Sequence, residues 1–309
     1  MTVLSAGSPP NTRGTELKPR RRRKWTGWGF IGPFLVVFLF VLVAPIVYAV
    51  YLSLFQDKLI GGNKFAGLAN YTAALKDPLF WTGFERVVLF LAIQVPIMLV
   101  LALGAALAID SARLHWTPFY RLSIFLPYAV PSVVGALMWG FLYGNQFGLV
   151  SDLDSWFHVD LPNVLQSGTW ILPAIGNIVT WEFIGYNMLI FYSALQTIPG
   201  DIYEAAELDN AGTWRIIWNI KLPALRPAIA IATIFSIIGS FQLFTEPSVL
   251  YPIATNAIGS AFTPNLYAYN LAFNGQEYNY SATIAIVMGI ITVIVAYVFQ
   301  RVSQRNQGA

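Results

Sequence analysis

Residues 196–227 read QTIPGDIYEAAELDNAGTWRIIWNIKLPALRP. This charged, turn-rich stretch lies between two long apolar intervals. Pro199 and Gly200 favour the end of the preceding helix. Asp201 suits a helix N-cap, and Glu204 follows at the spacing of a capping box. The stretch therefore predicts a compact helix–turn–helix that lies outside the bilayer between two membrane-crossing helices.

The same stretch predicts where its two short helices end. The first helix covers about 202–209, and Asn210 favours a left-handed helix end. Thr213 suits the cap of a second helix over 214–221, which Pro223 ends. Two interpretations of this loop are open. Its apolar side chains (Ile202, Tyr203 and Leu208) contact a docked partner, or they pack on the protein's own spans.

The composition places most of the chain in an apolar medium. Of the 309 residues, 56% are hydrophobic and 11% are charged, whereas a soluble domain carries about 25% charged residues. There is no cysteine, so a disulfide framework or thiolate metal site is excluded, and two histidines are a poor basis for another metal site. We expect an all-α membrane protein with no metal site and no catalytic residue.

Uncharged intervals locate the spans, because a crossing helix needs about 20 mostly apolar residues. They predict six spans within a single domain over 25–305, at about 28–52, 87–110, 121–144, 171–195, 225–246 and 279–300. Pro127 and Pro131 fall inside the third interval, where they favour a kink or a helix end. Residues 247–276 are also uncharged, but their many Pro, Gly and Asn residues predict a loop. A re-entrant piece packed against protein is the alternative.

Lys and Arg are distributed unequally between the two sides of the predicted bundle. With six spans, the side that holds both termini and the 197–223 loop receives 14 of them, and the other side receives 4. Cytoplasmic loops carry the Lys/Arg excess, so both termini and this loop are predicted to be cytoplasmic. A seventh span at 247–276 would weaken the asymmetry to 12 against 6.

The basic pI belongs to the N-terminal tail. Residues 1–24 carry a net charge of +6, and the remainder carries −3. A run of like charge before a long apolar stretch predicts a disordered cytoplasmic tail that signals topology, followed by an uncleaved first span. It gives no reason to infer nucleic-acid binding; the expected environment is the lipid bilayer.

The loop resembles the EAA loop of ABC importer permeases, in which Glu-Ala-Ala, three residues, Gly, nine residues and Ile-x-Leu-Pro follow one another. The matching residues are Glu204, Ala205, Ala206, Asp209, Ala211, Ile220, Leu222 and Pro223. Asn210 stands where the family usually has Gly, and because Asn tolerates the same backbone region we expect the turn to be kept. The resemblance implies a coupling helix seated in a cleft of an ATPase subunit, with Glu204 against a basic residue of that subunit.

The resemblance extends over about 28–300 and is closest to the carbohydrate branch, of the maltose, glycerol-phosphate and lactose type. The pieces that carry it are Gly67–Tyr71, Leu126 and Pro127 with Pro131, and Phe241–Pro247. It implies a multi-pass permease subunit in the bacterial plasma (inner) membrane that moves a carbohydrate into the cell. The implied partners are a second homologous permease subunit, an ATPase subunit dimer that binds the ATP and Mg²⁺, and an extracytoplasmic solute-binding protein. Because the chain lacks a GxxxxGK[ST] phosphate loop, it is not an enzyme by itself and binds no cofactor of its own.

Glu182 lies in the middle of the fourth interval. A carboxylate at bilayer depth costs about 2.5–3.5 kcal/mol on insertion scales, so it should face the bundle interior or water. It either accepts hydrogen bonds from sugar hydroxyls or forms a structural pair with a neighbouring helix. The resemblance implies a sugar path on the fourth and fifth spans; the candidates are Trp181, Glu182, Gly185, Asn187, Gly239, Ser240, Gln242 and Glu246.

Three other classes of protein compete with this interpretation. A self-sufficient secondary transporter tends to show repeats and several buried charges, and the sequence shows neither clearly. A membrane-embedded enzyme needs paired catalytic groups at one depth, and none is evident. An ABC permease for an amino acid or phosphate is disfavoured by the motif that ends the fifth span.

Overall fold

A computed structural model describes residues 25–58, 62–111, 114–158 and 162–307; the predicted basic tail, 1–24, lies outside them. The chain divides into two compact units, Met1–Tyr48 and Ala49–Ala309. In the first unit, α1 (Trp25–Phe38) leads through a π-helical turn, η1 (Leu39–Val43), into α2 (Ala44–Ser53), whose last residues belong to the second unit. The stretch Trp28–Ser53 is long and apolar enough to cross a membrane.

The second unit consists of one hairpin and a series of helices. Strands β1 (Phe55–Lys58) and β2 (Gly62–Phe65) pair antiparallel, with Phe55 opposite Phe65. The helices are α3 (Ala69–Ala74), α4 (Pro78–Ile109), α5 (Thr117–Phe125), η2 (Leu126–Ala129), α6 (Ser132–Leu142), α7 (Leu149–Phe157), α8 (Ile171–Leu195), α9 (Gly200–Leu208), α10 (Thr213–Ile216), η3 (Ile217–Lys221), α11 (Leu222–Phe241), α12 (Thr245–Leu250), α13 (Pro264–Phe273) and α14 (Tyr278–Gln307).

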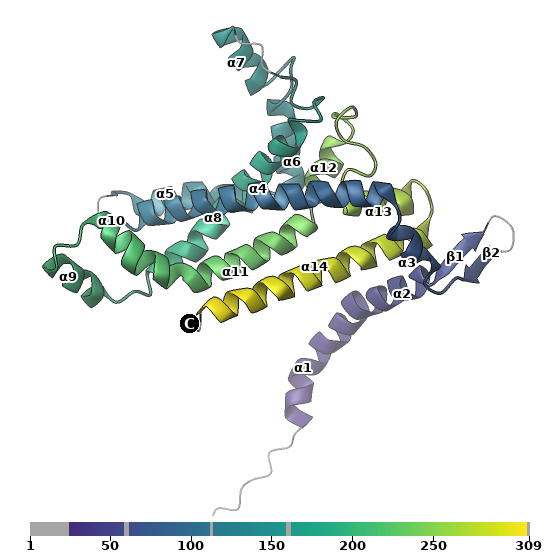
Figure 1. The fold of residues 1–309 in the computed structure, drawn as a ribbon, viewed down its shortest axis with the longest axis horizontal. Coiled ribbons are helices and arrows are strands. Elements are labelled where there is room, and N and C mark those ends of the chain that lie inside the picture. The colour runs from purple at the N-terminus through teal and green to yellow at the C-terminus, as the bar shows by residue number, and fades with distance from the viewer. Residues whose placement is uncertain (1–24, 59–61, 112–113, 159–161, 308–309) are drawn as a thin grey trace, which may run out of the picture. The chain divides into compact units, whose positions relative to one another are not determined.

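Helices α4, α8, α11 and α14 lie side by side and form the bundle (Figure 1). Where α4 meets α8 and α11, several buried side chains are small: Ala102, Ala106, Ala228 and Ala232. Small residues let helix backbones approach closely, which matters in lipid because acyl chains are as apolar as the side chains they replace. Close packing between α4, α8 and α11 therefore holds this part of the bundle together.

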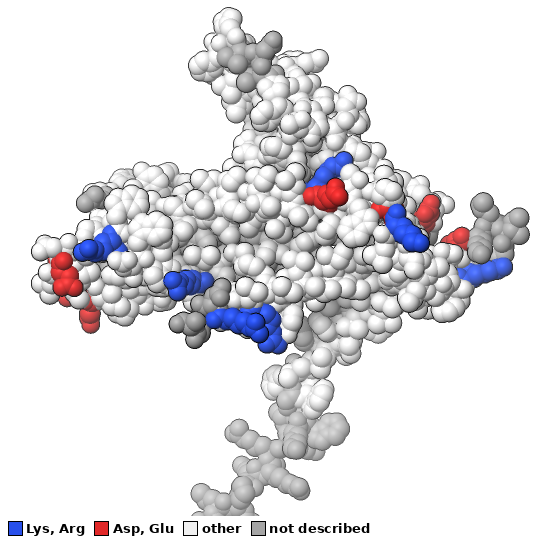
Figure 2. Space-filling view, in the orientation of Figure 1, with Lys and Arg blue, Asp and Glu red and all other residues white. Residues whose placement is uncertain are grey.

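Five helical stretches within the described residues are long and apolar enough to cross a membrane. Besides Trp28–Ser53 they are Pro78–Ile109, Ile171–Leu195, Thr213–Leu250 and Tyr278–Arg305, and the bent pair of α5–η2 with α6 raises the number to as many as six. Figure 2 shows an uncharged surface along the middle of the bundle, with most visible charged side chains toward its ends. The predicted helical membrane fold is confirmed in the coarser sense that the structure is mostly helical; the β1–β2 hairpin was not predicted.

The third predicted span, 121–144, is not one straight helix. The axis of Thr117–Ala129 turns by 96° into that of Ser132–Leu142. Proline lacks an N–H and drives the residue before it out of the helical region, and Val130, before Pro131, is accordingly extended with ψ 130°. Both expectations for these prolines, a helix end and a kink, are met here, and the size of the bend makes this segment a broken span or a re-entrant pair.

The segment 247–276 is ordered and packed against the bundle. It contains the end of α12, a series of turns and α13, and its side chains at Leu250, Ala254, Ile258 and Leu266 are at most 2% exposed. They pack with α8 residues such as Ile171 in one apolar cluster. The segment contains no span of its own, as predicted, but it is core structure rather than an open loop.

Asp77 joins three helices at one end of the bundle. Its carboxylate accepts a hydrogen bond from the Leu79 N–H at 2.9 Å, which caps α4, and one from each hydroxyl of Tyr267 on α13 and Tyr280 on α14 at 2.8 Å. Burial by itself would raise the pKa of Asp77, but these hydrogen bonds hold it below its ordinary value of 3.8. The cap, with Pro78 behind it, explains why α4 begins before residue 87.

We expect Asp77→Ala to destabilise the protein by about 1–3 kcal/mol, because a helix cap and two charge-assisted hydrogen bonds are lost. The pKa of Asp77 is lower in the folded protein than in the unfolded chain. The carboxylate therefore contributes its full stabilisation above pH 3.8 and loses it as the pH falls through the pKa of the folded state. Thermal unfolding in detergent should show a gap between wild type and Asp77→Ala that narrows below pH 3.8. Asp152→Ala, at an exposed position, is the control; a gap that does not change with pH would contradict the assignment.

Candidate functional site

The 197–223 loop forms a two-helix unit at one end of the bundle (Figure 1). Helix α9 is followed by Asn210, which has φ 54°, so the predicted left-handed turn is confirmed. The Ala211 N–H donates to the Ala206 carbonyl at 2.9 Å and closes the helix end. The chain then reverses into α10, which leads through η3 into α11.

Both helix starts in the loop differ from the prediction. The N-cap residues are Pro199 for α9 and Gly212 for α10, and neither has a side chain that can accept a hydrogen bond. Asp201 and Thr213 therefore lie in first turns and do not cap them, and the capping box with Glu204 does not form. Asp201 still stabilises α9 through the positive end of the helix dipole.

The predicted stop at Pro223 is wrong. The helix continues from α10 through η3 into α11, and Leu222, between η3 and Pro223, keeps helical backbone angles. Proline removes one N–H from the helical ladder, and the π-helical turn Ile217–Lys221 just before it accommodates the change in hydrogen bonding. The second half of the loop is thus a rigid extension of the following span.

The motif residues of α9 divide between an exposed and a buried side. Glu204, Ala205, Asp209 and Asn210 are exposed, whereas Ala206 is only 9% exposed. Beyond α9, Ala211 and Leu222 are half-buried and Pro223 is exposed. Glu204 forms no ion pair within the described ranges of the chain. Its carboxylate is therefore available to a cation on another protein.

Large apolar side chains surround this carboxylate. Ile202 is 44% exposed and Leu208 is 85% exposed, so neither is buried against the protein's own spans. Exposed apolar surface beside a charge indicates a protein-binding site. Trp214 and Trp218, which the sequence analysis missed, are also more than half exposed. Their spacing of four residues could have revealed them, although Trp at the end of a span also suits the bilayer interface.

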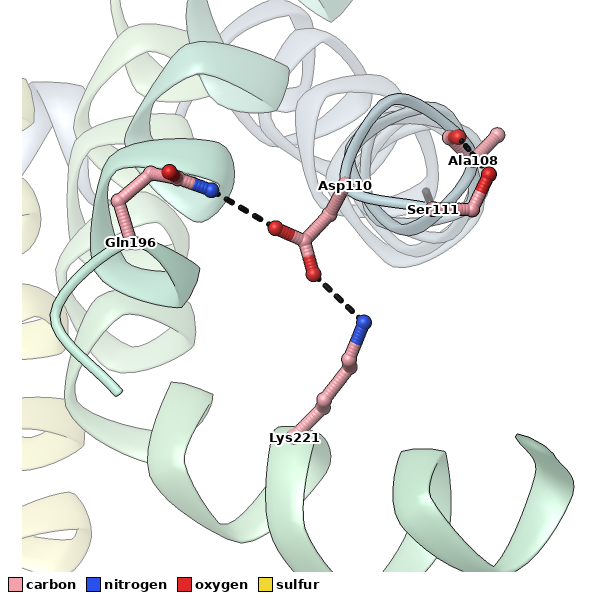
Figure 3. Close-up of polar contacts among 5 residues, drawn as sticks. All are labelled: Ala108, Asp110, Ser111, Gln196 and Lys221. Atoms are coloured by element: carbon pink, nitrogen blue, oxygen red, sulfur yellow. Dashed lines mark hydrogen bonds and ion pairs between the residues drawn. The ribbon is translucent and has the colours of Figure 1, made fainter. Parts of the chain in front are cut away.

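Asp110, Gln196 and Lys221 meet at the base of the loop; we call these three residues the loop-base junction. The Asp110 carboxylate, just beyond α4, accepts a hydrogen bond from the Gln196 side-chain amide at 2.7 Å and pairs with the Lys221 ammonium at 2.5 Å (Figure 3). The side chains of Lys221 and Asp110 are 13% and 10% exposed. Asp110 and Gln196 were not among the predicted site residues. One feature of the sequence could have indicated Asp110: it is the first charged residue after a long uncharged interval.

Tyr203 connects the junction to α9. The Lys221 ammonium lies 5.5 Å from the centre of the Tyr203 ring, within cation–π range. Burial, together with the negative charge of Asp110, raises the pKa of Tyr203. Tyr203 immediately precedes Glu204, so the residue that carries the motif carboxylate is one position from the junction.

A cavity of about 430 Å³ lies within the bundle, between α4, α8, α11 and α12. Its lining includes five of the eight predicted path residues: Asn187, Gly239, Ser240, Gln242 and Glu246. Aromatic rings face it as well, and Tyr128 stacks on Tyr186 with ring centres 5.0 Å apart. Among the described lining residues there is no Lys, Arg or His. The cavity combines aromatic faces with amide, hydroxyl and carboxylate groups.

The other three predicted path residues lie outside the lining of this cavity. Trp181 packs edge-on against Trp139 of α6, with ring centres 5.9 Å apart. Glu182 is 3% exposed, and neither carboxylate oxygen has a hydrogen-bond partner among the described residues. Gly185 is buried where α8 crosses α5 and η2: a Cβ there would overlap the Ile124 carbonyl and the Phe125 Cα.

Glu182 owes its place to Gly135 on α6. A Cβ on Gly135 would lie 2.6 Å from a Glu182 carboxylate oxygen, so a larger residue there would force the acid to shift. The indole N–H of Trp139, one helical turn beyond Gly135, is also buried without a partner among the described residues. Buried polar groups are almost always hydrogen-bonded in native proteins, so these orphaned groups suit a polar molecule that enters between α6 and α8.

Long apolar helices around a polar cavity, with a charged two-helix loop at one end, define a multi-pass membrane transport protein. The chain belongs to the family of binding-protein-dependent transport system inner membrane components, which matches residues 17–307. The resemblance inferred from the EAA motif is thereby confirmed. As a member of this family the chain is a transport subunit and not an enzyme.

Named relatives cover almost the whole chain. The lactose transport system permease protein LacF of Rhizobium radiobacter is 29% identical, over 88% of this chain and 91% of its own length. The sulfoquinovosyl glycerol transport system permease protein SmoG of Agrobacterium fabrum is 30% identical, over 90% of this chain and 94% of its own length. A bacterial alginate ABC transporter, solved in complex with an alginate pentasaccharide-bound periplasmic protein, has the same fold, with a TM-score of 0.81, 18% identity and coverage of 92% and 95%.

Proposed function

We propose that this chain is a permease subunit that moves an uncharged carbohydrate into the cell, driven by ATP that partner subunits hydrolyse. The observation that carries the proposal is the 197–223 loop, called the α9 loop from here on. On it an unpaired carboxylate, Glu204, lies among exposed apolar side chains. A loop of this kind fits a cleft on an ATPase subunit, where a cation would pair with Glu204. The relative named for lactose transport supports an uncharged carbohydrate.

The chemistry of the cavity supports an uncharged substrate. Aromatic rings stack on the apolar faces of sugars, and amide and hydroxyl groups exchange hydrogen bonds with sugar hydroxyls. Glu246 lines the cavity, Glu182 lies close enough to interact with it electrostatically, and no cationic side chain lines the cavity among the described residues. An anionic sugar would find no cation to pair with in a medium of low dielectric constant, so it should be rejected.

In the proposed topology the chain spans the bacterial inner membrane six times, with the bent pair of α5–η2 and α6 as one broken span. Both termini and the α9 loop lie in the cytoplasm, as the Lys and Arg distribution favours. The complex contains a second homologous permease, an ATPase dimer that binds ATP and Mg²⁺, and an extracytoplasmic solute-binding protein. Gln242 and Glu246 lie toward the outer side in this arrangement, where they line the external gate of the path.

Affinity purification in mild detergent and uptake by proteoliposomes test this function together. We expect an ATPase subunit and a second permease to co-purify, and the complex with its binding protein to take up one of lactose, maltose or trehalose only when ATP is inside. Alginate oligosaccharides should not be taken up. ATP-independent uptake, or a tagged chain that brings down no ATPase, would refute the proposal.

Asn187→Leu tests the path through the cavity. Asn187 is 2% exposed, and its side-chain amide donates to the Phe183 carbonyl at 3.0 Å, which leaves its oxygen free for a sugar hydroxyl. Losing one buried polar contact costs about 1–3 kcal/mol, so the KM for the transported disaccharide should rise about tenfold with assembly unchanged. Asn219→Leu, at an exposed position on η3, is the control. An unchanged KM in Asn187→Leu would remove this residue from the path.

A further inference from the structure

We propose that the loop-base junction is a latch, which makes the α9 loop and the adjoining ends of α4, α8 and α11 move as one body. Asp110 is the positioning residue of this latch. The inference rests on the proposed coupling role of the loop and adds a component to it. It explains how a displacement of α9 reaches α4, a span that is not adjacent to the loop in sequence.

The geometry of Asp110 links both ends of the loop at one point. Gln196 follows the last residue of α8, and Lys221 precedes the first residue of α11. Each bonds a different oxygen of the same carboxylate, which stands on the end of α4 (Figure 3). Moving Lys221 away from α4 therefore breaks an ion pair that is largely shielded from water, and moving Gln196 away breaks a hydrogen bond to the same carboxylate at a more exposed position.

The loop itself is connected to this point through Tyr203. Its ring lies beneath the Lys221 ammonium, and its neighbour Glu204 is the exposed carboxylate of α9. A force on Glu204 thus passes through one aromatic contact to Lys221, and from there to Asp110. The α9 helix needs no other contact to transmit its motion to three spans.

The packing on the membrane side of the junction favours motion as a unit. Directly beyond it, buried residues of the three spans form one apolar cluster, which includes Ile109 of α4, Leu195 of α8 and Leu225 of α11. Close-packed interiors transmit displacement because they hardly compress. A buried ion pair by itself adds little net stability, so its value here lies in fixing a geometry.

Three variants test the latch in the complete complex reconstituted with its binding protein. Asp110→Asn keeps the shape but removes the charge, Lys221→Met removes the ammonium, and the double variant Asp110→Lys with Lys221→Asp reverses the pair. We expect each single variant to bind the ATPase. The ratio of sugar transported to ATP hydrolysed should fall about fivefold or more. The reversed pair restores the ion pair but loses the cation–π contact with Tyr203, so its ratio should lie above that of either single variant and below that of wild type. Asp152→Asn, an exposed acid on α7, is the control.

A spin-label measurement tests the same inference without transport. The chain has no cysteine, so Glu207→Cys on α9 and Ala108→Cys on α4, both at exposed positions, can be labelled specifically. In the complex, the distance between these labels should stay the same when a non-hydrolysable ATP analogue with Mg²⁺ is added. In the Asp110→Asn background, the distribution of distances between the labels should broaden or shift when the nucleotide is added.

The possible results separate the latch from the proposed function. If the wild-type complex assembles and transports with ATP, but the single variants keep the wild-type ratio, the latch is refuted and the function stands. A label distance that changes with nucleotide in the wild-type background would also refute it. If single variants fail to assemble, the reversed pair decides: an assembled double variant that transports no sugar per ATP hydrolysed means that the ion pair is not the connecting element. If wild type binds no ATPase, the proposed function fails first.

Discussion

Glu204→Lys should abolish ATP-driven uptake while leaving the chain folded in the membrane. Glu204 is exposed and forms no ion pair within the described residues, so its replacement removes no internal contact. In the proposed complex its carboxylate faces a cation of the ATPase. The substitution therefore brings two like charges together, which costs several kcal/mol, or a loss of binding of about 100-fold or more.

The measurement is co-purification of the ATPase together with uptake of the identified disaccharide. Glu277→Lys makes the same charge change at another exposed position, beside the start of α14, and should leave ATPase binding intact. Glu204→Gln should fall between wild type and Glu204→Lys, since it loses the attraction without adding repulsion. Full uptake by a Glu204→Lys complex of normal composition would show that α9 is not the coupling element.

Gly185→Val should prevent the chain from accumulating as a folded protein. A Cβ at Gly185 would overlap the backbone of Ile124 and Phe125, and backbone cannot move aside as a flexible side chain can. Overpacking of a well-packed interior costs about 1–3 kcal/mol, and a clash with backbone belongs at or above the upper end of that range. Stability in detergent, followed by size-exclusion chromatography after mild heating, measures the effect.

Gly104→Val is the matched control, because a Cβ at Gly104 on α4 meets no atom within 4 Å. It should behave like wild type. This comparison also tests the two interpretations of Gly185. If Gly185→Val folds normally but alters only the KM for sugar, the residue belongs to the path as the family resemblance implied. If the protein is lost, Gly185 is primarily a helix-crossing residue.

The sequence was most informative where a single helix carries the signal. The interval 171–195 corresponds to helix Ile171–Leu195, because a mostly apolar stretch of that length is stable in lipid only as a helix. The α9 loop was also predictable: its turn at Asn210 depends on a local backbone preference. Local capping was less predictable, since Asp201 and Thr213 have the chemistry of caps, but Asp201 is the second residue of its helix and Thr213 the first residue of its own.

The sequence was least informative where residues far apart must meet. Nothing local shows that Asp110 bonds Gln196, which is 86 positions away, and Lys221, which is 111 positions away. The division of the path residues has the same origin. Asn187 and Gly185 are two positions apart on α8. Asn187 lines the cavity, whereas Gly185 lies where α8 packs against α5 and η2. That difference depends on which neighbours surround α8, and hydropathy holds no such information.

The sequence by itself determined the class of this protein: apolar intervals, the unequal distribution of Lys and Arg and one spaced motif are properties of the chain read in order. Only the tertiary structure decided the 96° bend at Pro131, the burial of 247–276 in the core and the junction of three spans at Asp110. The physical reason is that lipid selects helices by their apolar length, whereas the arrangement of those helices depends on close packing between surfaces that are distant in sequence.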